Sequence, residues 1–130
     1  MATMATMATA LAYVAATLVA LWGVAHSIPT RRVLESFEPI SVDNRRILLQ
    51  EWLAEALTMW GVAAVVVSVT IAAGAGSTAS HSVYRATAGL VLALAVLTTV
   101  TGARTPVVWF KICPVLLTVS AILLVSASLA

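Results

Sequence analysis

The stretch from Arg31 to Glu55 reads RRVLESFEPISVDNRRILLQEWLAE and gathers most of the charge in an otherwise apolar chain. It holds all five acidic residues and four of the seven basic ones. The whole chain of 130 residues is 62% hydrophobic and only 9% charged, with a mean hydropathy of +1.06. A soluble domain of this size buries only about 60–70% of the surface that its unfolded chain exposes. The composition therefore predicts a membrane protein with one charged segment outside the hydrocarbon.

Four stretches are apolar and long enough to cross the hydrocarbon, which takes about 20 residues of helix. Breakers such as Pro29, Gly74 and Gly102 separate them. The alternating pattern of a β-barrel strand is missing from the sequence. We expect an all-α fold, a polytopic membrane four-helix bundle that forms one domain over residues 1–130. The spans are predicted at about residues 6–26, 52–73, 86–102 and 107–129.

The basic residues predict how the chain is oriented in the membrane. With four spans, the first and third loops share one side, and that side holds Arg31, Arg32, Arg45, Arg46, Arg104 and Lys111. Only Arg85 falls on the other side. The positive-inside rule then places the charged loop, residues 27–51, in the cytoplasm and both termini outside a plasma membrane, the inner membrane of a bacterium.

Aromatic residues near the span ends suggest a belt at the headgroup level. Trp22, Trp52 and Trp109 fall near the predicted cytoplasmic boundary, and Tyr84 falls near the opposite one. Indole and phenol rings favour this level because one edge is apolar and the other is wet.

The charged loop has its own local structure. Apolar residues at helical spacing over 31–38 predict a short amphipathic helix at the interface, which Pro39 should end. Ser41 is then suited to cap a new helix, with Asp43 in its first turn. We expect that helix to run without a break into the second span, over about 45 Å in total.

Glu51 and Glu55 lie where this helix enters the membrane. They are four residues apart and share a face, so they repel each other by about 0.2–0.5 kcal/mol. No basic residue lies three or four positions away, so a counter-charge must come from another segment. The candidates on the same side of the membrane are His26, Arg31, Arg32, Arg104 and Lys111.

Glu51 and Glu55 are either solvent-exposed with no role or part of a cluster with His26, Arg104 and Lys111, and this cluster has two interpretations. It is either a set of ion pairs that fixes the register of the helices, or a polar pocket open to the cytoplasm. Such a pocket would hold a proton, a cationic substrate or a quinone head group. No cofactor or metal is predicted, because one cysteine and two histidines predicted on opposite sides give no ligand set for zinc or haem.

The block from Phe37 to Ala56, FEPISVDNRRILLQEWLAEA, resembles a block in small uncharacterised bacterial four-span membrane proteins. In size and span count the chain is also similar to DoxX-like proteins, and this resemblance implies an accessory role in quinone redox chemistry. Small multidrug transporters are similar in length and span number and use a glutamate in the first helix. Here the first span has no acid, and the candidate, Glu55, lies in the second.

These residues form no complete catalytic set, which favours a non-enzymatic protein. We expect an integral membrane accessory subunit or a small-ligand-binding protein with its polar cluster at the cytoplasmic face. One alternative is a proton-coupled small-molecule transporter that acts as an oligomer and exchanges protons on Glu55. Another is a quinone-linked redox accessory protein that uses His26 and Glu51. The expected partners are the lipid bilayer and further membrane subunits, and a net charge of +2 gives no case for nucleic acid.

Overall fold

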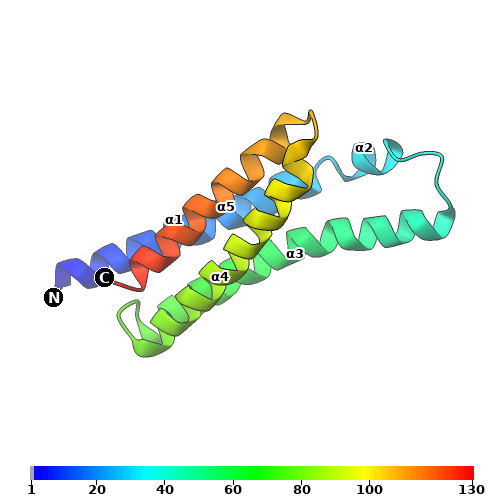
Figure 1. Cartoon of the computed structure of the whole chain (residues 1–130). Helices are drawn as coiled ribbons and strands as arrows, with labels where there is room; N and C mark the ends of the chain where they lie inside the picture. Colours follow the sequence, from blue (N-terminus) through cyan, green and yellow to red (C-terminus); the bar gives the residue numbers. More distant parts are fainter. Residues whose placement is uncertain (1) are drawn as a thin grey trace.

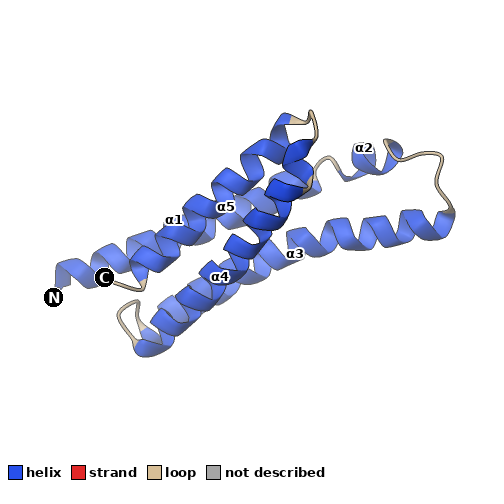
Figure 2. Cartoon of the chain, in the orientation of Figure 1, coloured by secondary structure: helices blue, strands red, loops and turns tan. Residues whose placement is uncertain are grey.

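Helices make up almost all of the chain in this computed structural model, which describes residues 2–130. No strand occurs within that range, so the expected all-α fold is confirmed (Figure 2). The long helices are α1 (Ala2–Ser27), α3 (Val42–Ala73), α4 (Thr78–Val100) and α5 (Val108–Ala127). Two short ones, α2 (Thr30–Glu35) and the 3-10 helix η1 (Gly102–Arg104), lie in the connections. The four long helices are each long and apolar enough to cross a membrane.

The long helices pair as two antiparallel hairpins, α1 with α3 and α4 with α5 (Figure 1). The hairpins join mainly through α1 and α5, while α4 packs more sparsely on α3. Both termini and the α3–α4 turn lie at one end of the bundle, which we call the terminal end. Helix α2 and the α4–α5 connection lie toward the opposite end, the α2 end.

The bundle core is built largely from small side chains. On α1, Ala12, Ala15 and Val19 are fully buried at a spacing of three and four residues. Small residues on such a stripe let two helix backbones approach closely, which drives packing where lipid removes the hydrophobic effect between helices.

Two serines set where helices begin. The Ser41 hydroxyl accepts a hydrogen bond from the Asn44 backbone N–H at 3.1 Å, and α3 continues from Val42 for 32 residues, about 48 Å. The Ser77 hydroxyl caps α4 in the same way, through the Ser80 N–H at 3.1 Å. Helix α4 therefore starts at Thr78, eight residues before the predicted apolar span, because capping sets the helix start and hydropathy does not.

Helix α2 is shorter than the amphipathic element expected over residues 31–38. It ends at Glu35 and contacts α3, with Leu34 buried. The chain between α2 and α3 is irregular up to Ser41, in keeping with the bias of a residue before proline, here Glu38, against helical backbone.

Gly23 marks a close crossing of α1 and α3. A Cβ atom added there would lie 2.7 Å from Trp60 Nε1 and 3.2 Å from Met59 Cβ. The same indole Nε1 donates a hydrogen bond to the Ala20 carbonyl at 3.2 Å, so the ring lies across the α1 backbone.

We predict that Gly23→Ala lowers the free energy of unfolding by about 1–3 kcal/mol, because the added methyl group overpacks this crossing. Gly61→Ala is the matched control, since a Cβ at Gly61 meets no atom within 4 Å. Thermal unfolding in detergent, followed by circular dichroism, measures both variants. Equal melting temperatures would show that the crossing has room for the methyl group.

Candidate functional site

His26, the second-last residue of α1, is held by α3 on two sides. The residue is 9% exposed, and its ring stacks on the Trp52 indole with ring centroids 3.9 Å apart and planes 21° from parallel. Its Nε2 lies 3.1 Å from the Trp52 carbonyl oxygen. A carbonyl only accepts hydrogen bonds, so Nε2 carries the proton and donates it.

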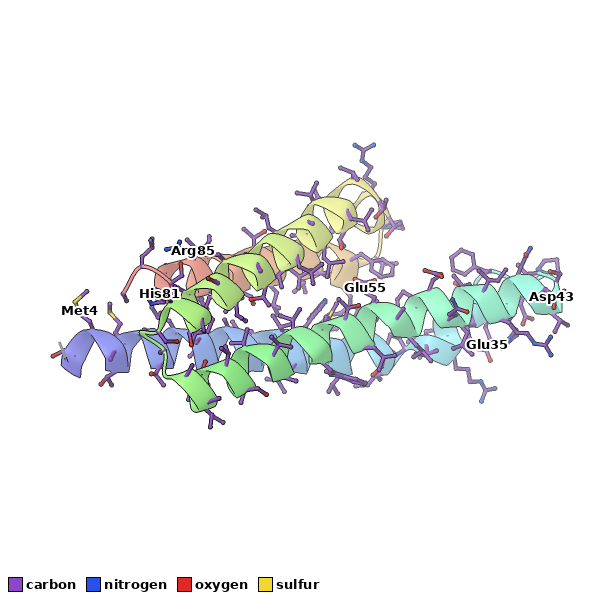
Figure 3. All side chains as sticks on the ribbon, turned by 90° about the horizontal axis from the view of Figure 1, so that it is seen from below. Met4, Glu35, Asp43, Glu55, His81 and Arg85 are labelled. Carbon is purple, nitrogen blue, oxygen red and sulfur yellow. The ribbon has the colours of Figure 1, made fainter. Side chains whose placement is uncertain are left out.

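Glu55 lies beside the same imidazole. Its Oε2 is 3.7 Å from His26 Nε2, and its side chain is 31% exposed against 7% for that of His26. This distance fits an ion pair when the imidazole is charged, and it is too long for a hydrogen bond. Glu55 lies on the side of α3 that faces α5 (Figure 3). A residue of α1 therefore lies within ion-pair distance of the carboxylate deepest in the span.

The other three predicted site residues do not join this pair. Glu51, Arg104 and Lys111 are exposed, and within the described residues none of them forms an ion pair. The reason is the packing order, since α5 packs on α1 and α4 and not broadly on α3. The structure thus brings together two of the five predicted residues, His26 and Glu55.

Aromatic side chains extend the site to a third helix. Phe110 of α5 meets the Trp52 ring edge-on, with centroids 6.1 Å apart. Trp22 of α1 donates its indole N–H to the Cys113 sulfur at 3.0 Å. Sequence reasoning assigned Trp22 and Trp52 to an aromatic belt and missed Phe110. For Trp52, the sequence does contain a signal that it belongs to the site, since it lies three residues from Glu55 on one helix face.

One donor at the site has no partner. The Trp52 indole Nε1 is buried and makes no hydrogen bond within the part of the chain that the structure describes. Leaving a buried donor unpaired costs about 1–3 kcal/mol. The site therefore combines a proton-bearing imidazole, a partly exposed carboxylate and an indole N–H free to meet an acceptor.

No metal chemistry is indicated here. Within residues 2–130, no group of three or more His, Cys, Asp or Glu side chains is placed to hold a metal ion. The charges of the segment from Arg31 to Arg46, which runs from α2 into α3, are largely paired within that segment. Its exposed ion pairs join Arg31 to Glu35, Arg45 to Glu38 and Arg46 to Asp43.

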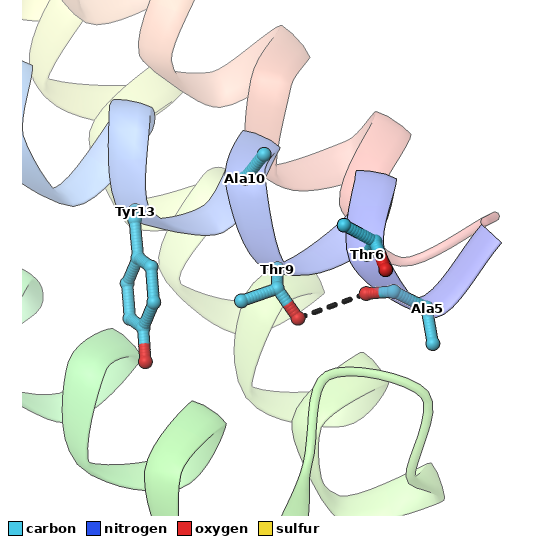
Figure 4. A pocket seen from close by; sticks show the side chains of 5 residues that line it. All are labelled: Ala5, Thr6, Thr9, Ala10 and Tyr13. Carbon is cyan, nitrogen blue, oxygen red and sulfur yellow. Dashed lines mark hydrogen bonds between the residues drawn. The ribbon is translucent and has the colours of Figure 1, made fainter. Parts of the chain in front are cut away.

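A surface pocket of about 480 Å³ lies away from this cluster, near the N-terminal part of α1 (Figure 4). It is lined by Ala5, Thr6, Thr9, Ala10 and Tyr13. The Thr9 hydroxyl donates to the Ala5 carbonyl at 2.8 Å, so this polar group is used within the helix. The pocket holds no charged side chain, and the His26–Glu55 pair remains the candidate site.

The four candidate spans indicate a multi-pass membrane protein by their length and composition. Comparisons of the chain with protein-family models, with curated proteins and with solved structures find no match. The resemblance to DoxX-like proteins and the bacterial source gain no support from them.

Two substitutions of His26 separate its ring stack from its polar contacts. We predict that His26→Phe keeps the ring stack on Trp52 but loses the hydrogen bond to the Trp52 carbonyl and the contact with Glu55, at a cost of about 0.5–1.5 kcal/mol of stability. His26→Ala also loses the stack and leaves a cavity, so it costs roughly 1 kcal/mol more. Unfolding in detergent measures both variants. Equal destabilisation would show that the stack contributes nothing.

Proposed function

We propose that the protein is a non-enzymatic integral membrane protein of the accessory-subunit kind, in which the polar cluster fastens α1 to α3. The observation that carries this proposal is the engagement of His26, whose ring face rests on Trp52 and whose Nε2 faces the Trp52 carbonyl and Glu55. An imidazole used in this way has little freedom to bind a substrate.

Polar contacts between α1 and α3 complement the alanine-rich core of α1. Its buried stripe is mostly alanine, as at Ala12 and Ala15, which lets the helix backbones approach closely but supplies no polar contact between them. Polar contacts at the end of the helix then fix its rotation and its register against α3. Within a membrane, each such contact is worth on the order of 1 kcal/mol.

The long N-terminal part of α3 supports an assembly role. Together with α2 and the chain between the two helices, it forms an extension past the candidate site. This extension carries exposed apolar residues, Phe37, Val42 and Ile47, beside its internal ion pairs. We infer that this extension lies at the cytoplasmic face of a plasma membrane, a bacterial inner membrane, with both termini outside, as the distribution of basic residues indicates. There it can contact headgroups, a second copy or another subunit of a larger complex.

Glu55→Gln tests the proposal. We predict a loss of stability on the order of 1 kcal/mol, because the partner of His26 loses its charge. Glu51→Gln is the matched control, since it removes an exposed and unpaired carboxylate one turn away on the same helix. Unfolding in detergent and proton flux in proteoliposomes are measured on the same preparations.

One outcome would contradict the proposal that Glu55 serves to attach α1 to α3. If Glu55→Gln melts like the wild type but abolishes a proton flux that the wild type shows, Glu55 is an exchanging carboxylate. The protein would then be a proton-coupled transporter.

A second candidate function is binding of a small ligand with an acceptor oxygen, such as a quinone head group. It is favoured by the unpaired Trp52 Nε1 beside His26 and Glu55. An acceptor on the ligand would satisfy this donor and relieve its burial cost.

Titration with a short-chain benzoquinone, followed by tryptophan fluorescence, tests this candidate. We predict saturable quenching in the wild type and a loss of the saturable component in Trp52→Phe, which keeps a ring at the stack but lacks the N–H. Trp109→Phe is the control, because Trp109 is 67% exposed and lies outside the cluster. Identical quenching in all three proteins would exclude a quinone site at Trp52.

A further inference from the structure

A groove of about 390 Å³ runs between α4 and α5, away from the His26–Glu55 pair. Its lining comes from one face of each helix and includes Arg85, Gly89, Leu92, Ala121, Val125 and Ser126. The floor is formed by small residues, since Ala121 is buried and Gly89 has no side chain. The walls are apolar, and Leu92 and Val125 are both more than two-fifths exposed.

Arg85 forms the polar end of the groove, at the terminal end of the bundle (Figure 3). Its Nε donates to the Ser128 hydroxyl at 3.2 Å, and its Nη2 donates to the Ser128 carbonyl at 3.3 Å. These bonds fix the guanidinium level with the end of α5. A guanidinium has five N–H donors, so three remain for another partner.

No acidic side chain of the protein is placed to neutralise this arginine. All five acidic residues lie between Glu35 and Glu55, and no carboxylate within the described residues forms an ion pair with Arg85. A charge at the edge of the hydrocarbon is stabilised by a partner or by contact with the interface. Arg85 is exposed, so its charge is left for the interface or for an anion from outside the chain.

The shape of the groove limits what this molecule can be. From Arg85 to Leu92 the groove follows about 10 Å of helix, roughly the diameter of a single helix with its side chains. That is short for a docked transmembrane helix and well suited to a segment of an extended acyl chain. A phospholipid places a phosphate at the level of the helix ends and its acyl chains along the apolar faces below.

We propose that this groove binds one phospholipid molecule. Arg85 holds the phosphate through charge-assisted hydrogen bonds, and an acyl chain lies over Gly89 between the two helices. Ser126, whose hydroxyl makes no hydrogen bond within the described residues, lies in the same lining as a second donor. Gly89 matters because a Cβ there would meet no atom within 4 Å, so the space above it is open to a chain.

Native mass spectrometry of the full chain in detergent, with dioleoyl phosphatidylglycerol added, tests the proposal. The wild type should retain one lipid per chain, and Gly89→Leu should bind roughly tenfold more weakly, because its side chain occupies the groove. Gly61→Leu is the matched control, since Gly61 is also an open helical glycine but lies on α3 outside the groove. It should bind like the wild type.

A second arm separates the phosphate from the chains. Arg85→Gln should weaken binding of phosphatidylglycerol on the order of tenfold, because the charged partner of the phosphate is lost. Dioleoyl glycerol, which has the same chains and no phosphate, should bind weakly to the wild type and equally to Arg85→Gln.

Several results would overturn the proposal. One is equal lipid retention by the wild type and Gly89→Leu, and another is equal affinity for the two lipids. Binding of inorganic phosphate as tight as that of the lipid would leave only an anion site. A dimer that is lost in Gly89→Leu would assign the groove to a second copy of the chain. If Arg85→Gln does not fold, the proposal is still tested by lipid retention in Gly89→Leu and by the affinity of the wild type for the two lipids.

Discussion

The attachment of α1 to its two neighbours is the interaction on which the rest of the bundle depends. Three ring N–H groups near the C-terminal part of α1 make it. Trp60 donates to the Ala20 carbonyl, Trp22 donates to the Cys113 sulfur, and His26 donates to the Trp52 carbonyl. Because these bonds lie close together along α1, they fix its rotation toward α3 and α5 at once. Helix α4 then completes the bundle through its hairpin with α5.

Several hydroxyl groups in the apolar helices form their hydrogen bonds within their own helix. Thr58, Thr98 and Thr118 each donate to the carbonyl four residues earlier, at 2.8, 2.8 and 2.7 Å. A hydroxyl satisfied by its own helix needs no partner on another helix, and it can face lipid at little cost. Thr70 differs, since it donates to Val66 and also accepts from the buried Tyr84 hydroxyl at 2.6 Å, a link between α3 and α4.

Much of the fold could be predicted because it rests on local signals. Apolar length predicts the long helices, and Ser41 predicts the start of α3 through one side-chain bond. The site was predictable only in part, because its members meet through tertiary packing. The sequence names His26 among the possible partners of Glu55 because both lie on the same side of the membrane, but that criterion cannot separate His26 from Lys111. Tyr84, expected at the headgroup level, is fully buried, since a phenol can also find its polar partner inside the bundle.

The two ends of the bundle handle charge in opposite ways, and this follows from where the acids lie in the chain. At the α2 end, Arg31, Arg45 and Arg46 each have an acidic partner between residues 35 and 43, and Glu55 has His26. At the terminal end, Arg85 has only the hydroxyl and carbonyl of Ser128, because every acidic residue is at least thirty positions away. Neutral acceptors orient a guanidinium without cancelling its charge. The α2 end thus holds the ion pairs of the described residues, together with the exposed and unpaired Glu51, Arg104 and Lys111. At the terminal end the guanidinium of Arg85 has only neutral partners within the chain, and the proposed phospholipid would supply its anion.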